Sequence, residues 1–318
     1  MLPDDRTTAL SAEAASELRD ALGRRQKELP PRWLATLDAS TLANGAEPAS
    51  GHTLEEVERE LGLAMLRDRL GDSQPRAVVC IGPSASGANA ALIESLCTRG
   101  SVAAVVTTEI DPTLATAMLT RITPRTIRPT SAAIRCDCTV ELPLPGALPR
   151  PRVYLALGNV LGSTTAVGAV RMLRHVRTTM RPGDAIILGL AAKRDTVDAS
   201  VDGHELDAAA TRHLRALDLL SSATGAGFDL ERFHFRPTFD AENSRAETHL
   251  VARKAFDVAV PGVCHVRFRK GESIRTSVSC AFDRTRVSAM MAGVGLTLRE
   301  WTTDPESRFV VALAGPAV

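Results

Sequence analysis

Short apolar runs alternate with amphipathic stretches through the first two thirds of the chain. The apolar runs have the length of buried strands and occupy residues 77–81, 102–106, 131–136, 152–157 and 185–190. Helical spacing of apolar residues, or a helix-forming composition, marks residues 11–28, 53–70, 88–94, 112–121 and 167–180. Strands that are apolar throughout and alternate with helices predict an α/β fold with a doubly wound, mostly parallel sheet.

The pattern changes after residue 195. A long helix predicted at 205–224 precedes short strand-like segments at 233–235, 248–252, 263–268 and 273–279. Strands joined by loops indicate an antiparallel element, so the second part of the chain is predicted to be α+β. A helix at 283–293 and a strand at 309–313 are expected to return to the first sheet, which is predicted to have seven strands.

This change of pattern predicts two domains, each built from two segments of the chain. The first domain comprises residues 63–195 and 286–318, and the second comprises residues 1–62 and 196–285.

Residues 76–111 combine a strand, a glycine-containing turn, a helix and a second strand that ends near Glu109 and Asp111. The turn, residues 82–87, has Ser84 where a second glycine is usual. Such an arrangement holds nucleotide-type cofactors, because glycine lets the backbone approach the ligand and the acid accepts hydrogen bonds from ribose hydroxyls. A parallel crossover without a ligand would contain much the same residues, so both interpretations stay open at this point.

The charge balance, the lack of long apolar runs and the cysteine content argue against several classes of protein. The chain has 38 Lys and Arg against 37 Asp and Glu, so no net field favours nucleic acid or an anionic membrane. No apolar run approaches the roughly 20 residues of a membrane span, and the first residues do not resemble a secretory signal. Six scattered cysteines predict neither a disulfide framework nor a metal site. We therefore expect a cytoplasmic protein.

Six segments of the chain resemble one enzyme family, in that family's order: residues 29–33, 157–163, 228–230, 242–250, 271–276 and 301–305. The most specific are Asn-Ser-Arg-Ala-Glu-Thr-His-Leu at 243–250 and Gly-Glu-Ser-Ile-Arg-Thr at 271–276. The chain is similar to the ergothioneine-pathway L-histidine Nα-methyltransferases, which use S-adenosylmethionine (SAM). The resemblance implies a Rossmann-like class I methyltransferase domain and an α+β substrate domain.

The resemblance also implies which residues bind the cofactor: Gly82, Ser84, Glu109, Asp137, Cys138 and Gly158. Glu109 falls on the acid that binds the ribose, with Asp111 as a rival. Asp137 and Cys138 fall where an Asp-Phe pair binds the adenine, and Gly158 lies beside the transferred methyl group. Purely structural roles stay open as well, because Glu109 is also suited to a solvated strand end and Asp137 to a helix cap.

For the substrate, the resemblance points to Asn159, Ser163, Arg275, Ser277 and Ser279. The family binds the amino acid's carboxylate and amine with tyrosines and an asparagine, and its imidazole with a glutamate and a serine. Here Ser163 stands at the asparagine position and Ser277 at the glutamate position, while Ser279 keeps the serine. The only tyrosine, Tyr154, lies within a predicted strand.

These residues predict a SAM-dependent N-methyltransferase that acts on a small amine or amino acid other than L-histidine, in a specialised biosynthetic pathway. Methyl transfer to an amine depends mainly on positioning, so no catalytic acid, base or metal ion is expected. The Arg245 and Glu247 pair is expected to orient the substrate domain. The alternative is a non-catalytic relative that serves as a binding or partner subunit. The sequence leaves the oligomeric state open.

Overall fold

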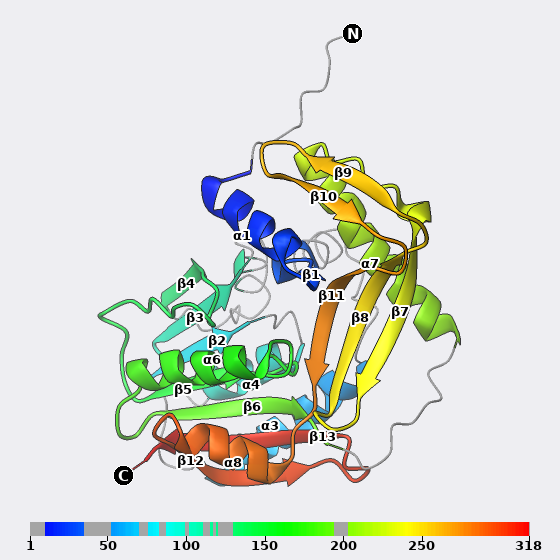
Figure 1. Cartoon of the computed structure of the whole chain (residues 1–318). Helices are drawn as coiled ribbons and strands as arrows, with labels where there is room; N and C mark the ends of the chain where they lie inside the picture. The colour runs from blue at the N-terminus through cyan, green and yellow to red at the C-terminus, as the bar shows by residue number, and fades with distance from the viewer. Residues whose placement is uncertain are drawn as a thin grey trace. The chain divides into compact units, whose positions relative to one another are not determined.

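A computed structural model describes residues 10–34, 52–69, 76–82, 87–98, 102–110, 115–116, 119, 130–193 and 203–317. The chain forms two compact units (Figure 1). The smaller unit comprises Met1–Gly45 and Val197–Val278, and the larger unit comprises Ala46–Thr196 and Ser279–Val318.

The larger unit is built on a seven-stranded sheet with the strand order β12-β13-β6-β5-β2-β3-β4. Its strands are β2 (Ala77–Ile81), β3 (Ala104–Glu109), β4 (Thr130–Arg135), β5 (Arg152–Ala156), β6 (Ala185–Ala191), β12 (Leu296–Thr303) and β13 (Phe309–Pro316). The strands from β4 to β6 run parallel, whereas β13 and β12 are antiparallel additions at one edge. The predicted α/β fold with a doubly wound, mostly parallel sheet is confirmed.

Helices cover both faces of this sheet (Figure 1), which is why strands β2, β3 and β5 are buried along their whole length. All five residues of β2 are buried. On one face, α3 (His52–Arg69) and α4 (Gly87–Thr98) pack together and place Leu66 and Leu92 in the core. On the other face lie α6 (Ala166–Thr179) and α8 (Arg284–Ala292).

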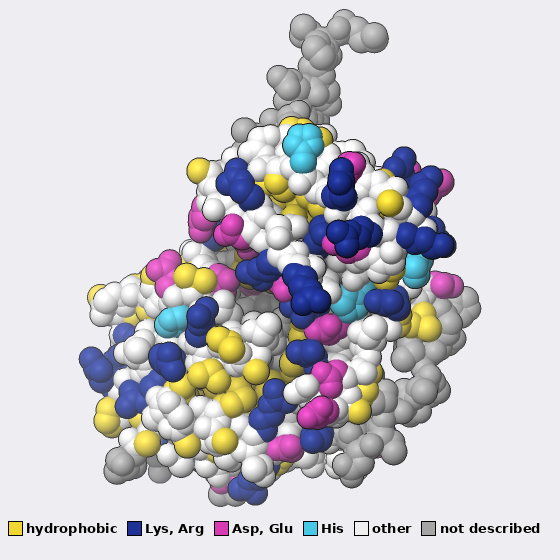
Figure 2. Space-filling model, viewed as in Figure 1, with side chains coloured by type: hydrophobic (Ala, Val, Ile, Leu, Met, Phe, Trp, Pro, Cys, Tyr) yellow, Lys and Arg dark blue, Asp and Glu magenta, His cyan; other side chains and the backbone are white. Residues whose placement is uncertain are grey.

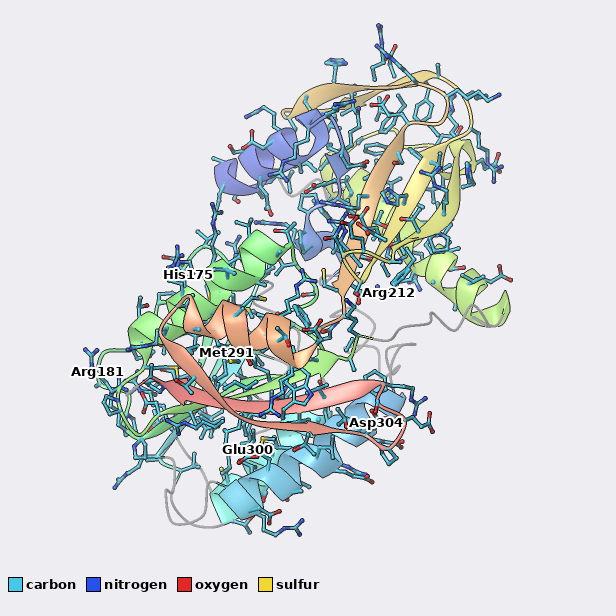
Figure 3. All side chains as sticks on the ribbon, turned by 60° about the horizontal axis from the view of Figure 1, so that its bottom comes forward. His175, Arg181, Arg212, Met291, Glu300 and Asp304 are labelled. Carbon is cyan, nitrogen blue, oxygen red and sulfur yellow. The ribbon has the colours of Figure 1, made fainter. Side chains whose placement is uncertain are left out.

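Capping side chains fix where the helices on that second face begin. The Thr165 hydroxyl caps α6 by accepting a hydrogen bond from the Gly168 amide at 3.1 Å. The Asp283 carboxylate caps α8 in the same way, accepting from the Arg286 amide at 2.7 Å. Helix α8 packs against β12 and buries Met291 (Figure 3).

The smaller unit combines helices with two sheets. Its elements are α1 (Ala12–Gly23), β1 (Lys27–Glu28), α7 (Gly203–Thr224), η1 (Leu230–Arg232), β7 (Phe233–Asp240), β8 (Arg245–Ala252), β9 (Phe256–Val260), β10 (Cys264–Phe268) and β11 (Ser273–Cys280). One sheet has the order β1-β11-β8-β7, and β9 and β10 form a separate hairpin. Three phenylalanines, Phe233, Phe256 and Phe268, pack in its core with ring centroids 5.0–5.5 Å apart.

The structure divides the chain at boundaries that differ from the predicted domain boundaries. Residues 46–62 and 279–285, which we predicted to join the substrate domain, belong to the larger unit. Helix α3 packs on α4 and contacts β13, so most of its apolar face is buried against the sheet. The strands β9 and β12 were not predicted. Most of the helix predicted at 112–121 lies outside the described residues.

Acidic and basic side chains are interspersed on the face shown in Figure 2. Within the described ranges, no helix is both long enough and apolar enough to cross a membrane. The described His, Cys, Asp and Glu side chains form no group of three or more that could hold a metal ion.

One buried carboxylate, that of Asp184, fixes the turn before β6. Its two oxygens accept hydrogen bonds from the backbone amides of Arg152 at 2.7 Å and Arg181 at 2.8 Å. Asp184 is fully buried and also pairs with the Arg150 guanidinium. We expect Asp184→Ala to lower the free energy of unfolding, measured with urea, by about 2–4 kcal/mol, because it leaves buried donors unpaired.

The matched control is Asp257→Ala, which removes an exposed carboxylate that pairs with Arg267 at 3.0 Å. That variant should lose no more than about 1 kcal/mol. Equal losses in the two variants would contradict a structural role for Asp184.

Candidate functional site

The carboxyl ends of β2 and β5 mark the point where the strand order of the parallel sheet changes direction. From β2 the chain continues to β3 and β4 on one side, while β5 and β6 lie on the other. Open α/β sheets bind ligands in the crevice at such a point. Glycines stand at both strand ends: Gly82 has φ +75° and Gly158 has φ +72°. These are left-handed conformations that favour glycine.

The Gly82 turn packs tightly against the loop after β5. The Gly82 amide donates a hydrogen bond to the Thr108 carbonyl at 3.1 Å. A Cβ at position 82 would lie 2.2 Å from the Cγ2 atom of Val160, so any side chain there would collide with the loop. The backbone conformation and the close contact therefore both require glycine at this position. Ser84 lies outside the described residues.

Glu109 is the last residue of β3 and is 3 % exposed, so it is not a solvated strand end. Burial, and secondly the negative charge of Glu109, raise the pKa of the Cys80 thiol on the neighbouring strand β2. The Glu109 side chain is therefore close enough to the end of β2 to change the pKa of Cys80, beside the Gly82 turn. Asp111 lies outside the described residues.

The Asp137 and Cys138 pair follows β4 and is held within its own turn. One Asp137 oxygen accepts hydrogen bonds from the amide and the hydroxyl of Thr139, at 2.8 Å and 2.7 Å. The Cys138 sulfur lies 3.4 Å from the Thr108 hydroxyl. Its hydrogen bond with Cys136, followed by burial, raises the pKa of Cys138, so this thiol stays neutral.

Asn159 ties three segments of the larger unit together. Its amide oxygen accepts a hydrogen bond from the Ala191 amide at 3.1 Å. Its amide nitrogen donates to the Cys280 carbonyl at 3.2 Å and lies 3.3 Å from the Ser279 hydroxyl. The side chain therefore fixes the loop after β5 and the end of β6 relative to Ser279 and Cys280, which belong to the same unit. The exposed Ser163 closes the same loop by donating from its hydroxyl to the Val160 carbonyl at 2.8 Å.

Glu58, on α3, was not predicted as a site residue. Its Oε1 atom accepts a hydrogen bond from the Gly158 amide at 2.6 Å, and the residue is fully buried. A Cβ at Gly189 of β6 would lie 1.8 Å from the same oxygen. The sequence did contain a signal for it, because Glu58 is three residues before Leu61 and seven before Met65, on the apolar stripe of a helix.

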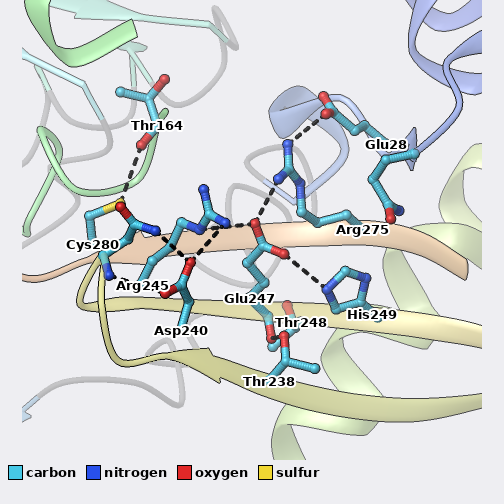
Figure 4. A network of polar contacts seen from close by, with 12 residues as sticks. Glu28, Thr164, Thr238, Asp240, Arg245, Glu247, Thr248, His249, Arg275 and Cys280 are labelled. Atoms are coloured by element: carbon cyan, nitrogen blue, oxygen red, sulfur yellow. Dashed lines mark hydrogen bonds and ion pairs between the residues drawn. The ribbon is translucent and has the colours of Figure 1, made fainter. Parts of the chain in front are cut away.

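In the smaller unit, Arg275 is engaged by two carboxylates. Its guanidinium donates to Glu247 at 2.7 Å and to Glu28 at 2.5 Å, and Glu247 also pairs with His249 at 3.2 Å (Figure 4). Burial alone would raise the pKa of Glu247, but the hydrogen bond and charge of Arg275, followed by the charge of Arg245, hold it below its usual range. Arg275 therefore joins β1, β8 and β11.

Ser277 belongs to a second polar cluster in the smaller unit, and this cluster is uncharged. The Thr248 hydroxyl lies 2.5 Å from the Ser277 hydroxyl and 3.4 Å from the Nε2 atom of His213. The His213 ring stacks on Phe235 with a centroid distance of 5.5 Å. Burial, and secondly the positive charge of Arg212, lower the pKa of His213 to about 4, so its imidazole is neutral near pH 7.

Comparison with known proteins shows to which family the chain belongs. The sequence profile of the SAM-dependent, histidine-specific methyltransferases matches residues 14–316, which is nearly the whole chain. The chain belongs to this family. It is a SAM-dependent methyltransferase with a class I, Rossmann-like fold, and the predicted family, enzyme class and cofactor are confirmed.

Two relatives show how far the chain has diverged from other histidine-specific methyltransferases. It is 26 % identical to the histidine Nα-methyltransferase of Mycobacterium tuberculosis (strain CDC 1551 / Oshkosh) over 305 residues, 94 % of this chain and 93 % of the relative. It is 33 % identical to that of Mycolicibacterium smegmatis over 167 residues, which cover only 51 % of each protein.

Among solved structures, a SAM-dependent methyltransferase from Bacteroides fragilis with S-adenosylhomocysteine aligns over 92 % of this chain and 98 % of its own. The TM-score is 0.48 and the identity 13 %.

The larger unit has features that fit SAM, the cofactor of the histidine-specific methyltransferases. Gly82 and Gly158 keep side chains away from the crevice, and a buried acid ends β3. Asn89 lies in the first turn of α4, two residues after the glycine turn, and is fully buried. Neither of its amide atoms has a hydrogen-bond partner among the described residues. Unpaired buried polar atoms are rare in proteins and are expected where a polar ligand completes a site.

The neutral His213 predicts how stability depends on pH. Its pKa is about 4 in the folded protein against 6.5 in the ordinary case, so the unfolded chain binds the proton more readily. The stability contributed by the neutral ring is present above pH 6.5 and is lost as the pH falls towards 4. In His213→Gln, which does not titrate, we expect the loss of unfolding free energy across this window to be smaller by about 2–3 kcal/mol.

Urea unfolding at several pH values measures this difference. His265→Gln is the control, because His265 is exposed. If His213→Gln kept the full pH dependence of the original protein, another group would be responsible.

Proposed function

We propose that this enzyme transfers the methyl group of SAM to the nitrogen of a small amine or amino acid other than L-histidine, in a specialised biosynthetic pathway. The observation that carries this proposal is the uncharged cluster of Ser277, Thr248 and His213. In the family that this chain resembles, the position of Ser277 is occupied by a glutamate that binds the histidine imidazole. Here a hydroxyl stands there, bound to another hydroxyl.

The distribution of tyrosine supports the same proposal. The relatives that are named histidine Nα-methyltransferases belong to a family that, by the resemblance, grips its amino acid with tyrosines. This chain has one tyrosine, Tyr154, which is fully buried in β5 with its hydroxyl 2.9 Å from that of Thr179. Tyr154 is therefore committed to the core, and another amine is the better acceptor for this site.

For the cofactor, we propose that Gly82, Ser84 and Gly158 form the backbone cradle. Glu109 accepts the ribose hydroxyls, and Asp137 with Cys138 borders the adenine. The support for Glu109 is its burial at the carboxyl end of β3. For Asp137, the support is its place in the turn directly after β4, which its Oδ1 atom holds by accepting from the amide and hydroxyl of Thr139.

Methyl transfer from SAM to an amine depends mainly on how the enzyme positions the two reactants. SAM supplies an activated methyl group on a sulfonium, and an in-line displacement needs a neutral nitrogen aligned with it. An α-amine with a pKa near 8 is partly neutral at pH 7, so no strong base is required. We assign acceptor binding to Asn159, Ser163, Arg275, Ser277 and Ser279. Among them, Asn159 and Arg275 act chiefly by holding the strand ends and sheets in place.

Cofactor binding is tested by isothermal titration with SAM and S-adenosylhomocysteine. Glu109→Ala should weaken binding of both by about 1–3 kcal/mol, because hydrogen bonds to a charged acceptor are lost. Asp137→Ala is measured beside it, and Glu94→Ala on the exposed side of α4 is the control. Unchanged affinity in both Glu109→Ala and Asp137→Ala would place the cofactor elsewhere. An original protein that binds neither ligand would favour a non-catalytic partner subunit.

The acceptor is tested with histidine itself. We expect no useful turnover of L-histidine, because a charge-assisted hydrogen bond to the imidazole is missing, and such a bond is worth on the order of 1.5–3 kcal/mol. Ser277→Glu should improve histidine binding, measured by titration in the presence of S-adenosylhomocysteine. The control is Ala259→Glu, which adds the same charge on the exposed face of β9, at a residue with no assigned role in acceptor binding. Efficient trimethylation of L-histidine by the original protein would refute this proposal.

A further inference from the structure

The buried carboxylate of Glu58 lies at the ligand-binding edge of the larger unit, although α3 precedes the sheet in the sequence. Its Oε1 atom is 2.6 Å from the Gly158 amide, directly after the carboxyl end of β5. The next residues of this loop include Val160, which packs against Gly82 at the carboxyl end of β2. Glu58 is therefore buried directly beside the crevice that is expected between the two strands at which the parallel sheet changes direction.

The packing around Glu58 holds its carboxylate in one place. The residue is fully buried, and Gly189 of β6 leaves the space that the carboxylate occupies, since a Cβ there would lie 1.8 Å from Oε1. On the neighbouring helix, Leu92 packs against Gly62, one turn after Glu58. The carboxylate is thus set between the ends of β5 and β6, away from water, where a charge acts over a longer range than at the surface.

The ligand of this crevice changes its charge during the reaction. SAM has a positively charged sulfonium, and S-adenosylhomocysteine has a neutral thioether at the same atom. When the S–CH3 bond breaks, its electron pair stays on sulfur, and the methyl group forms a bond to the acceptor nitrogen, whose lone pair supplies the electrons. The nitrogen becomes cationic and afterwards releases a proton to solvent. A fixed negative charge near sulfur therefore favours the donor over the product.

We propose that Glu58 supplies this charge, and that it makes the enzyme bind the sulfonium form of its cofactor in preference to S-adenosylhomocysteine. Glu58 also orients the Gly158 amide, so it is a positioning residue as well as an electrostatic one. The proposal concerns the cofactor alone and does not depend on which amine is methylated.

The test compares the affinities of the two ligands by isothermal titration. Glu58→Gln keeps the size of the side chain and an oxygen that accepts from the Gly158 amide, and it removes the charge. We expect the dissociation constant for SAM to rise about tenfold and that for S-adenosylhomocysteine to change by less than about twofold, as for two charges about 12 Å apart in a medium of effective dielectric constant about 20. Glu58→Asp, which keeps the charge, should retain most of the preference for SAM.

Glu60→Gln is the matched control, because Glu60 lies on the exposed side of the same helix and its replacement removes the same net charge. Thermal unfolding identifies any variant that has lost its fold, and the ratio of the two dissociation constants is insensitive to a smaller fraction of folded protein. An equal change for both ligands in Glu58→Gln would overturn the proposal, since it would assign Glu58 a structural role alone. If the original protein bound neither ligand, the cofactor assignment itself would fail, which is a separate result.

Discussion

Close packing of backbone at the carboxyl ends of β2 and β5 is the constraint on which the rest of the larger unit depends. Gly82 has no room for a side chain against Val160, and Gly158 directs its amide at Glu58. Two glycines in left-handed conformations bring the loops together at the point where a parallel sheet opens. Asn159 then joins this loop to the end of β6 and to Ser279 and Cys280 by three hydrogen bonds. The ligand-binding edge is thus fixed mostly by backbone and amide groups.

The charges of the side chains near the candidate sites differ between the two units, and this difference affects which ligands each unit is suited to bind. In the larger unit, the buried side chains near the crevice include two acids, Glu58 and Glu109. In the smaller unit, the carboxylates of Glu28 and Glu247 are matched by Arg275, and the cluster around Ser277 consists of hydroxyls and a neutral imidazole. The proposed function assigns the cationic methyl donor to the first environment and the acceptor to the second.

The prediction of the fold succeeded where burial alone decides the pattern. The continuous apolar runs at 77–81, 152–157 and 185–190 correspond closely to β2, β5 and β6, because strands buried on both faces need no polar positions. Strand β12 was missed, because it lies at the edge of the sheet, has mixed polarity, and contains a register shift between Leu298 and Glu300 that breaks the alternation. Strand β9 was missed although its residues alternate regularly between buried and exposed, as expected of a strand with one face in the core.

The sequence by itself determined the family, the parallel sheet, and the positions of Gly82, Glu109 and Gly158 at the ends of its strands. These follow from local patterns and motifs, in which each residue is interpreted beside its neighbours in the chain. Only the tertiary structure decided that Arg275 is occupied by Glu28 and Glu247, that Thr248 and His213 share a cluster with Ser277, and that Glu58 reaches Gly158, 100 residues away. Each of these contacts joins different elements, and the partner of a buried polar group depends on how strands and helices pack, which no local pattern specifies.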